Sequence, residues 1–424
     1  MNVLLVSANT ETLNMVPLPL GLNCVAVATR AAGHPVELLD LMGAEDGGSA
    51  LLREAVQRLQ PAVIGVSVRN VDGQDMADPR LLLPPVQAAI ACCRSLSTAP
   101  IVLGGAGYSM YPEAMLDYLQ ADMGIHGEGE TAFPALLDRL QRGSDLAGIP
   151  GLYAPGFGAG SRSPHDALLD TLPLPDPSLW SAGSRTADTW VPFQARRGCP
   201  MNCSYCSTAS VEGTAIRTRQ PAAVVQGLAR HVEAGFRSFY FVDNVFNIPL
   251  PYAKALCADL QRAELGIRWR CILYPGHIDE ELVQAMAAAG CVEVSLGFES
   301  GCARLLRNLN KTYTPAEVVA AAQLLARHGI RRLGFLLLGG PGETRETVLE
   351  TLAFADALQL DQLRLTAGIR IYPDTALAQA AVRDGFIAPD DDLLIPRFYL
   401  ARGLEGWLGP TVQEWIAERP HWGT

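Results

Sequence analysis

Three cysteines stand close together near the middle of the chain. They occupy the run Arg197-Gly198-Cys199-Pro200-Met201-Asn202-Cys203-Ser204-Tyr205-Cys206, which follows a short strand-like segment. Thiolates are soft ligands suited to iron–sulfur clusters or zinc. Three of them can hold three irons of a [4Fe–4S] cluster and leave the fourth iron open to a substrate or cosubstrate. A zinc site would want a fourth Cys or His, and none lies within twenty residues. A cluster is therefore the favoured interpretation, and zinc or unligated thiols are the alternatives.

Polar residues and glycines close four later segments with strand-like patterns. They are Asp243 and Asn244, Glu299 and Ser300, Gly340 with Glu343, and Tyr372. Carboxylate and amide oxygens can accept hydrogen bonds from an amine, and a carboxylate can accept two from vicinal hydroxyls. Glycine lets the backbone approach a flat ring. The plainer alternatives are an Asx turn at Asp243, a helix N-terminal charge at Glu299 and a tight turn at Gly340. Cys302 follows the Glu299 turn and could be a catalytic thiol, but a buried structural thiol is the favoured interpretation. Lys311 is one of only two lysines in the chain, and the favoured interpretation is a solvated cation at a helix end.

Six β/α units position these residues. The expected strands are Val191–Ala195, Ser238–Val242, Trp269–Leu273, Val292–Leu296, Arg332–Leu338 and Gln362–Ile371, with helical patterns between them such as Pro221–Ala234 and Pro315–Arg327. Six parallel units predict a partial TIM-like barrel, open on one side, with its chemistry at the carboxyl ends of the strands.

The first 145 or so residues form a separate set of five β/α repeats. They predict a doubly wound parallel sheet of flavodoxin-like order with ligands at the strand carboxyl ends. Small, polar and glycine residues gather at those ends. They are Ser67, Val68, Arg69 and Asn70 after the third strand, Gly104, Gly105 and Gly107 after the fourth, and Glu128, Gly129, Glu130 and Thr131 after the fifth.

The expected boundaries follow from these patterns. Residues 1–145 form the first domain, and 146–190, rich in Gly, Pro, Ser and Asp, form a linker. Residues 191–388 form the barrel, and 389–424 form an irregular tail with several aromatic residues.

Composition narrows the function. The 424 residues are 49% hydrophobic and carry a net charge of −11, which argues against a nucleic-acid partner. The ten cysteines do not have the spacing of a disulfide framework. The N-terminus has no basic region before its apolar run, and no apolar stretch is long enough to span a membrane. These features predict a protein of the reducing cytoplasm.

The cysteine spacing, Tyr205 before the last cysteine and the six β/α units resemble the radical S-adenosylmethionine (SAM) superfamily. The resemblance covers about residues 190–385 and implies a [4Fe–4S] cluster on Cys199, Cys203 and Cys206. It also implies a SAM site made of Tyr205, Asp243, Asn244, Glu299, Ser300, Gly340 and Tyr372. In that family Asp243 and Asn244 would meet the methionine amino group, Glu299 the ribose hydroxyls, and Tyr372 the adenine. The chain departs from the family pattern at three positions. Asn244 stands where the family often has a second acid, and Leu336 and Asp374 stand where it has glycines.

The first domain resembles the cobalamin-binding domain of the cobalamin-dependent subgroup. The resemblance implies that the strand-end residues given above contact cobalamin. The chain lacks the Asp-x-His-x-x-Gly motif that supplies a cobalt ligand in related mutases, so cobalamin would bind without a protein histidine. A domain that has lost cobalamin and a generic nucleotide-binding domain are the alternatives, and the second lacks an early G-x-G-x-x-G.

Together these patterns predict an enzyme that methylates an unactivated carbon of a small metabolite or peptide, through a 5′-deoxyadenosyl radical and methylcobalamin. The alternative is a cyclase, ring-rearrangement enzyme or epimerase that uses the same cofactors. A transfer-RNA methylthiotransferase would want cysteines for a second cluster, and a non-enzymatic sensor would have no need of the triplet. The expected partners are the substrate and an electron donor such as flavodoxin or ferredoxin, with no nucleic acid and no membrane span. No residue is assigned as a catalytic acid or base.

Overall fold

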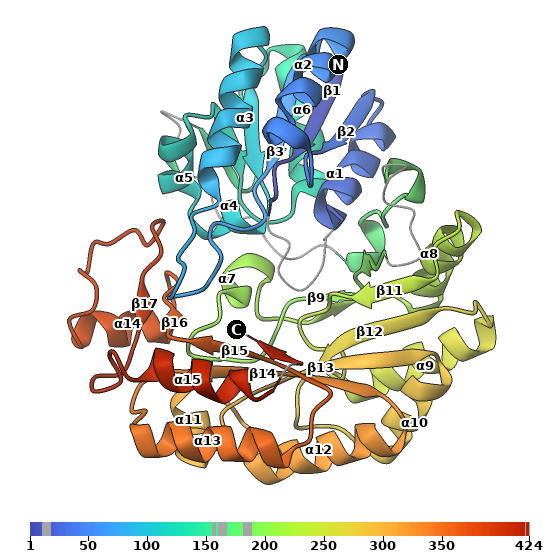
Figure 1. Ribbon diagram of the computed structural model, residues 1–424. Helices are drawn as coiled ribbons and strands as arrows, with labels where there is room; N and C mark the ends of the chain where they lie inside the picture. The colour runs from blue at the N-terminus through green and yellow to red at the C-terminus, as the bar shows by residue number, and fades with distance from the viewer. Residues whose placement is uncertain (11–17, 155–157, 160–167, 181–188, 420, 424) are drawn as a thin grey trace.

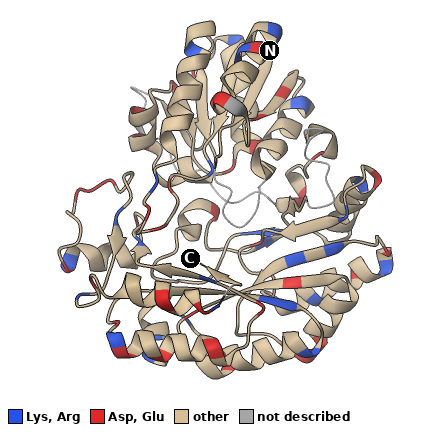
Figure 2. Ribbon diagram, in the orientation of Figure 1, with Lys and Arg blue, Asp and Glu red and all other residues tan. Residues whose placement is uncertain are grey.

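Two seven-stranded sheets, the first mostly parallel and the second wholly parallel, lie one above the other in the view of Figure 1. The structure is a computed structural model, and it describes residues 1–10, 18–154, 158–159, 168–180, 189–419 and 421–423. All ten cysteines are free thiols. No helix among the described residues is long and apolar enough to cross a membrane. Acidic and basic residues are interspersed over the outer helices, with further basic residues on strands of the second sheet (Figure 2).

The first sheet has the strand order β2-β1-β3-β4-β5-β6-β7. Its strands are β1 (Val3–Ser7), β2 (Val36–Asp40), β3 (Val63–Ser67), β4 (Ile101–Gly104), β5 (Met123–Ile125), β6 (Leu152–Ala154) and β7 (Gly158–Ala159). The first five are parallel, whereas β6 and β7 are antiparallel additions at one edge. The flavodoxin-like order expected for the five β/α repeats is therefore confirmed.

Helices cover both faces of this sheet, which explains why the strands β1, β3, β4 and β5 are almost wholly apolar and buried. They are α1 (Leu20–Ala31), α2 (Ser49–Leu59), α3 (Leu83–Leu96), α4 (Ala106–Met110), α5 (Pro112–Leu119) and α6 (Gly129–Arg142), with a short 3₁₀ turn η1 (Glu45–Gly48). Alternate β1 residues point to opposite faces. Leu4 and Val6 pack with α2, α3 and α5, while Val3 and Leu5 pack with α1 and α6.

The second sheet has the order β18-β15-β14-β13-β12-β11-β8 and is parallel throughout. Its strands are β8 (Val191–Phe193), β11 (Ser238–Phe241), β12 (Arg268–Leu273), β13 (Cys291–Glu299), β14 (Arg331–Leu338), β15 (Gln362–Ala367) and β18 (Trp422–Gly423). The six strands expected for the partial barrel are all present, and they are neighbours in chain order.

The helices of the second layer pack on one face of that sheet (Figure 1). They are α8 (Pro221–Glu233), α9 (Leu250–Ala263), α10 (Glu280–Ala288), α11 (Ala303–Asn308), α12 (Pro315–Arg327), α13 (Arg345–Ala357) and α14 (Ala376–Arg383). The capping box of Thr314 and Glu317 fixes the start of α12, and Asp279 caps α10. Large buried side chains such as Phe241 and Trp269 fill the space under the helices.

Short elements connect the two sheets. They are the 3₁₀ turns η2 (Leu169–Thr171) and η3 (Pro177–Leu179), the hairpin β9 (Arg196–Arg197) with β10 (Arg217–Thr218), the helix α7 (Thr208–Glu212), and the pair β16 (Ile369–Arg370) with β17 (Phe398–Tyr399). Figure 1 shows α7 and β9 between the two layers.

Two segments are more ordered than their composition suggested. The expected linker contributes β6 and β7 to the first sheet, and the expected irregular tail forms α15 (Leu408–Ala417) and then β18. Backbone pairing at a sheet edge needs no periodic pattern, which is why these short strands gave no signal in the sequence.

Candidate functional site

The three cysteines lie on the loop that follows β9, at the carboxyl end of β8. Backbone hydrogen bonds hold this loop: Cys199 N donates to Gly213 O at 3.1 Å, and Ser204 N donates to Leu309 O at 3.1 Å. Gly198 has φ +87°, and a Cβ there would lie 2.0 Å from Ala215 O. Glycine is therefore required at the start of the loop because the backbone strands approach too closely for any side chain.

The thiols of this loop interact with one another. Cys199 is buried, and Cys203 and Cys206 are half-buried. Burial and the neighbouring thiols raise the pKa of Cys199 to about 11, and burial also raises the pKa of Cys203. Metal binding displaces such protons, so a bound cluster would supply the thiolate form. No three His, Cys, Asp or Glu side chains in the described part of the chain converge on a single metal ion. A cubane does not require this, because each thiolate binds a different iron.

Glu299 and Lys311 lie beside the cysteine loop. Glu299, at the end of β13, adopts φ +58°, which is strained for a residue with a side chain. Its Oε1 accepts hydrogen bonds from Tyr205 Oη at 2.8 Å and Lys311 Nζ at 3.2 Å. The Lys311 side chain is only 5% exposed, and its Nζ also donates to Tyr205 Oη at 2.9 Å. The Glu299 carboxylate is thus held at the edge of the cysteine loop by two neighbours.

Asp243 does not occupy an open ligand surface. It is fully buried, and its Oδ1 accepts hydrogen bonds from Ala195 N at 2.8 Å and Arg196 N at 3.0 Å. Its Oδ2 lies 3.4 Å from Arg196 Nε. Burial raises its pKa to about 6 despite this guanidinium. Through its Oδ1 the carboxylate fixes the turn between β8 and β9, a role that the sequence could not show. The contact of Asp243 with the amino group of SAM stays a prediction.

Asn244 is half-buried and faces the loop. Its Nδ2 donates to Glu212 Oε2 at 2.5 Å, and its Oδ1 lies 3.5 Å from Thr208 Oγ1. Thr208 in turn contacts the sulfur of Cys206 at 3.2 Å. Of the two adjacent polar residues, Asn244 is the one whose side chain lies toward the cysteines.

The remaining predicted SAM residues differ in exposure. Ser300 is buried, and its hydroxyl pairs with Thr351 Oγ1 at 3.0 Å, so it supports the turn after β13. Gly340 N donates to Glu343 Oε2 at 3.0 Å. Tyr372 is half-buried, and the Arg370 guanidinium lies 5.2 Å from its ring centroid.

Asp374 has φ +58°, the left-handed conformation that glycine adopts readily. The turn after β16 therefore keeps the backbone shape of a glycine turn, and the departure from the family pattern at this position does not change it. Asp374 also lines a second cavity, of about 200 Å³, together with His126, Tyr153 and Ser207.

A larger cavity, of about 350 Å³, opens at the carboxyl ends of the first sheet. Its inner wall is apolar and includes Leu5, Val102 and Phe133, and glycines 65, 104, 105 and 129 let the backbone line it closely. The second layer closes the cavity with Gln194, Arg197, Val211, Glu212, Tyr240 and Val242. An apolar cavity with few polar groups at its mouth fits the buried part of a large organic cofactor.

Seven of the eleven residues predicted to contact cobalamin line this cavity. They are Ser67, Arg69, Gly104, Gly105, Glu128, Gly129 and Glu130. Val68, Asn70, Gly107 and Thr131 are not in its lining. Val68 and Gly107 instead join the segments that follow β3 and β4, because Gly107 N donates to Val68 O at 2.9 Å. Thr131 is exposed on the first turn of α6.

The residues predicted to contact cobalamin do not include the whole lining. Ser7 at the end of β1, Asn9 just after it, and the segment 18–22 before and in α1 also line the cavity. The rule that ligands lie at strand carboxyl ends applies to β1 as well and could have found Ser7. The second-layer residues could not be found, because they reach the cavity only through the packing of the two sheets.

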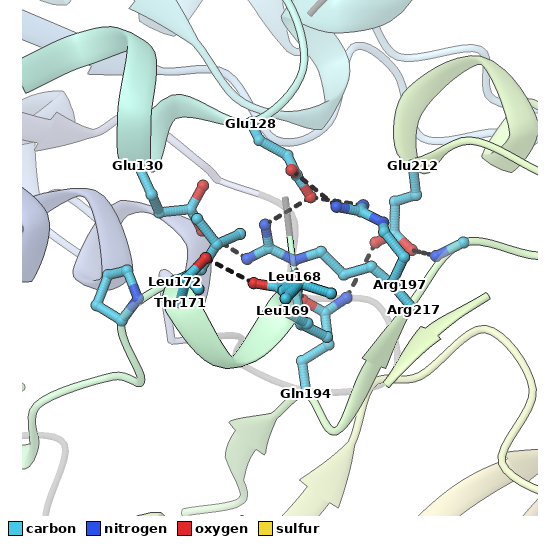
Figure 3. Close-up of polar contacts among 12 residues, drawn as sticks. Glu128, Glu130, Leu168, Leu169, Thr171, Leu172, Gln194, Arg197, Glu212 and Arg217 are labelled. Atoms are coloured by element: carbon cyan, nitrogen blue, oxygen red, sulfur yellow. Dashed lines mark hydrogen bonds and ion pairs between the residues drawn. The ribbon is translucent and has the colours of Figure 1, made fainter. Parts of the chain in front are cut away.

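A buried charge network crosses between the layers at this cavity (Figure 3). Arg197 donates to Glu128 Oε1 at 2.9 Å and to Glu130 Oε1 at 2.5 Å. Arg217 donates to both oxygens of Glu128, at 2.6 and 3.0 Å. The two arginines hold the pKa of the Glu128 carboxyl below its usual range. Glu128 and Glu130, expected to contact cobalamin, thus carry a second role in joining the layers.

A second contact of the same kind joins the segment after β3 to β16. Arg370 donates to Asp72 Oδ2 at 2.8 Å and to Tyr111 Oη at 3.1 Å, and all three residues are buried. Its remaining donors reach the carbonyl oxygens of Ile371 and Leu393. Because both contacts are desolvated and geometrically fixed, they set the angle between the two layers.

Two family models match the chain. The model described as B12 binding domain matches residues 6–137, and the model of the radical SAM superfamily matches residues 195–355. These ranges contain the cavity of the first layer and the cysteine loop of the second.

Individual proteins are also similar to this chain. An uncharacterized methyltransferase of Pyrococcus horikoshii is 28% identical over 87% of this chain and 79% of its own length. The tryptophan 2-C-methyltransferase of Streptomyces laurentii is 26% identical over 85% of this chain and 72% of its own length. The structure of the radical SAM methyltransferase TsrM from Kitasatospora setae, with cobalamin and a [4Fe–4S] cluster bound, matches with a TM-score of 0.85. That match covers 100% of this chain and 92% of the other, and at 24% identity it shows the shared fold.

Proposed function

This chain belongs to the cobalamin-dependent radical SAM enzymes, and from that premise we propose that it is a methyltransferase acting on an unactivated carbon of a small metabolite or peptide. The observation that carries the proposal is that residues next to the cysteine loop also line the cavity of the first layer: Gln194, Arg197 and Glu212, which accepts a hydrogen bond from Gly198 N. The two reactive groups would then lie close to one another, as methyl transfer to a carbon radical requires.

Cys199, Cys203 and Cys206 would hold the cluster, and the cavity of the first layer would hold cobalamin without a histidine ligand. When bound, the cluster with SAM supplies a 5′-deoxyadenosyl radical, and cobalamin supplies the methyl group. The protein positions these groups and excludes water and oxygen from them.

The side chains of the site support a revised set of SAM contacts. Glu299, held by Tyr205 and Lys311, offers a carboxylate for the ribose hydroxyls. Asn244 offers an amide beside the cysteines, Gly340 a bare backbone, and Tyr372 a ring for the adenine. Asp243 and Ser300, which hold the neighbouring turns, support this set through their contacts with Ala195, Arg196 and Thr351.

A small substrate suits the space that remains. The related Streptomyces protein is named for the methylation of tryptophan, and the expected domains leave few residues for a separate substrate domain. A reducing cytoplasm and a flavodoxin or ferredoxin belong to the same proposal, because the cluster must receive an electron in each radical cycle. The alternative is that the same cofactors drive cyclisation, rearrangement or epimerisation.

Anaerobic reconstitution tests the proposal. The protein is loaded with iron, sulfide and hydroxocobalamin, then incubated with methyl-labelled SAM, a reductant and an extract of small metabolites. We expect bound corrinoid, 5′-deoxyadenosine, S-adenosylhomocysteine and labelled methyl groups on a metabolite. Deoxyadenosine without transferred label would favour the alternative, and absence of both bound corrinoid and deoxyadenosine would refute the assignment. The C206A variant is the control, since it should keep corrinoid and lose deoxyadenosine.

A further inference from the structure

Arg197 belongs to both cofactor sites. It lies two residues before Cys199, in β9, and its side chain lines the cavity of the first layer. We propose that Arg197 is a positioning residue that couples the two sites, so that occupancy of the cobalamin cavity changes the cluster environment and the reverse. This inference rests on the proposed function, because it requires both cofactors to bind.

The first step in the argument is the fixed geometry of the contact. Arg197, Glu128 and Glu130 are each less than 10% exposed. A guanidinium presents its donors in a planar fork, and here Nη1 and Nη2 go to different carboxylates of the first layer while Nε donates to Gln194 at 2.9 Å. All three directions are used by named acceptors, so the side chain cannot move without moving or losing one of them (Figure 3).

The second step is the position of the carboxylates. Glu128 and Glu130 flank Gly129 at the start of α6, and all three residues line the cavity. A large cofactor entering this space meets the carboxylates or the backbone that carries them. Binding therefore favours the arrangement of Glu128 and Glu130 that leaves room for it, which is the differential interaction that coupling requires.

The third step is the connection from Arg197 to the cysteines. Gly198 N donates to Glu212 Oε2 at 3.1 Å, and Cys199 N donates to Gly213 O at 3.1 Å. Glu212 also accepts from Gln194 at 3.0 Å and from Asn244 at 2.5 Å. Since the backbone has no free space at Gly198, a shift of Arg197 is passed to Cys199 and Asn244 and is not absorbed by the loop.

The structure supplies a matched control. Asp72 forms a buried ion pair with Arg370 that also joins the two layers, at 2.8 Å. Asp72 is absent from the lining of the cavity, and Arg370 is far in sequence from the cysteine loop. The D72N variant therefore removes one buried carboxylate charge between the layers, as E130Q does, without touching the path through Arg197.

The experiment is a binding cycle on the full chain. The dissociation constant of hydroxocobalamin is measured by absorption, anaerobically, for protein with the reconstituted cluster and for protein without it. The ratio of the two constants measures coupling, and any direct contact between a mutated residue and cobalamin cancels from it. We expect a ratio of about 5 to 150 in the unsubstituted protein and in D72N. We expect a ratio near one in R197Q and in E130Q.

A second readout keeps the test independent of affinity. Adding hydroxocobalamin should change the Mössbauer spectrum of the oxidised ⁵⁷Fe cluster in the unsubstituted protein and D72N, and leave it unchanged in R197Q. If R197Q does not fold, as judged by circular dichroism, E130Q carries the test from the other side of the contact. A ratio near one in the unsubstituted protein, an unchanged ratio in folded R197Q or E130Q, or loss of coupling in D72N would each overturn the inference. Failure to bind either cofactor would instead overturn the proposed function.

Discussion

The substitution E343Q should stabilise the protein at alkaline pH and have much less effect at acid pH. Glu343 is 4% exposed. Its Oε2 accepts hydrogen bonds from Gly339 N and Gly340 N, while its Oε1 is buried without a hydrogen-bond partner among the described residues. Desolvation outweighs the two backbone donors and raises the pKa of this carboxyl from 4.5 to about 7.

The direction of the pH effect on stability depends on which state, folded or unfolded, binds the proton more tightly. Between pH 4.5 and 7 the folded protein holds a proton on Glu343 that the unfolded chain has lost, so the free energy of unfolding falls as pH rises through this range. The loss is complete above pH 7 and amounts to about 3 kcal/mol. A glutamine is neutral at every pH, so the E343Q variant does not lose this stability as the pH rises. Its amide NH₂ would face the small cavity beside Ser300 and Gly340.

The assay is chemical denaturation of the same cofactor-loaded protein at pH 5 and pH 8, under anaerobic conditions. We expect E343Q to exceed the unsubstituted protein by about 2 to 3 kcal/mol more at pH 8 than at pH 5. Any pH-independent effect of the amide cancels from this difference. The control is E346Q, three residues on, because Glu346 is exposed and its pKa is lowered. Equal effects of E343Q at both pH values, within about 0.5 kcal/mol, would refute the reasoning.

Three further substitutions test other parts of the site. G198A should destabilise the chain by at least about 2 kcal/mol and prevent cluster assembly, because φ is +87° and a Cβ would collide with Ala215 O. Iron content and the denaturation midpoint measure these two effects, and normal cluster loading would contradict the prediction. K311M should cost about 3 to 5 kcal/mol, because it leaves Glu299 buried without its ammonium partner; urea unfolding measures this, and K311R should recover part of the loss. G105A should weaken corrinoid binding while leaving the cluster spectrum intact. Gly105 lines the cavity at φ +99°, and an added Cβ would lie 2.6 Å from the backbone oxygen of Val68. Unchanged corrinoid affinity would contradict the prediction.

The fold was largely predictable because its signals are local. Apolar runs of four to eight residues mark buried parallel strands, and regular spacing by helical patterns implies their order. The order β2-β1-β3-β4-β5 and the six barrel strands agree with that reading. Strands β7 and β18, with two residues each, have no periodicity to detect and exist only through pairing with a neighbour.

The site was predictable in position but not in orientation. Asp243 and Asn244 are adjacent, and successive residues at a strand end point in different directions. Packing against Arg196 placed the first inside the fold and left the second beside the cysteines. Lys311 is similar: its position near a helix end suggested exposure, but the turn after α11 directs it into a buried contact with Glu299. Spacing identifies the strand end, and only tertiary packing decides which of its residues reaches a ligand.

The ion pairs between the layers also could not be predicted from the sequence. The sequence marks Glu128 and Glu130 as polar residues at a helix start, and it marks Arg197 only as a neighbour of the first cysteine. Their contact spans 67 to 69 residues of chain and arises when the hairpin β9–β10 docks against α6. A carboxylate at such a position could serve a cofactor, a partner arginine or both, and the cavity lining shows that here it is within reach of both. The residues that connect two cofactor sites are therefore found at the interface between domains, where no motif of either domain specifies them.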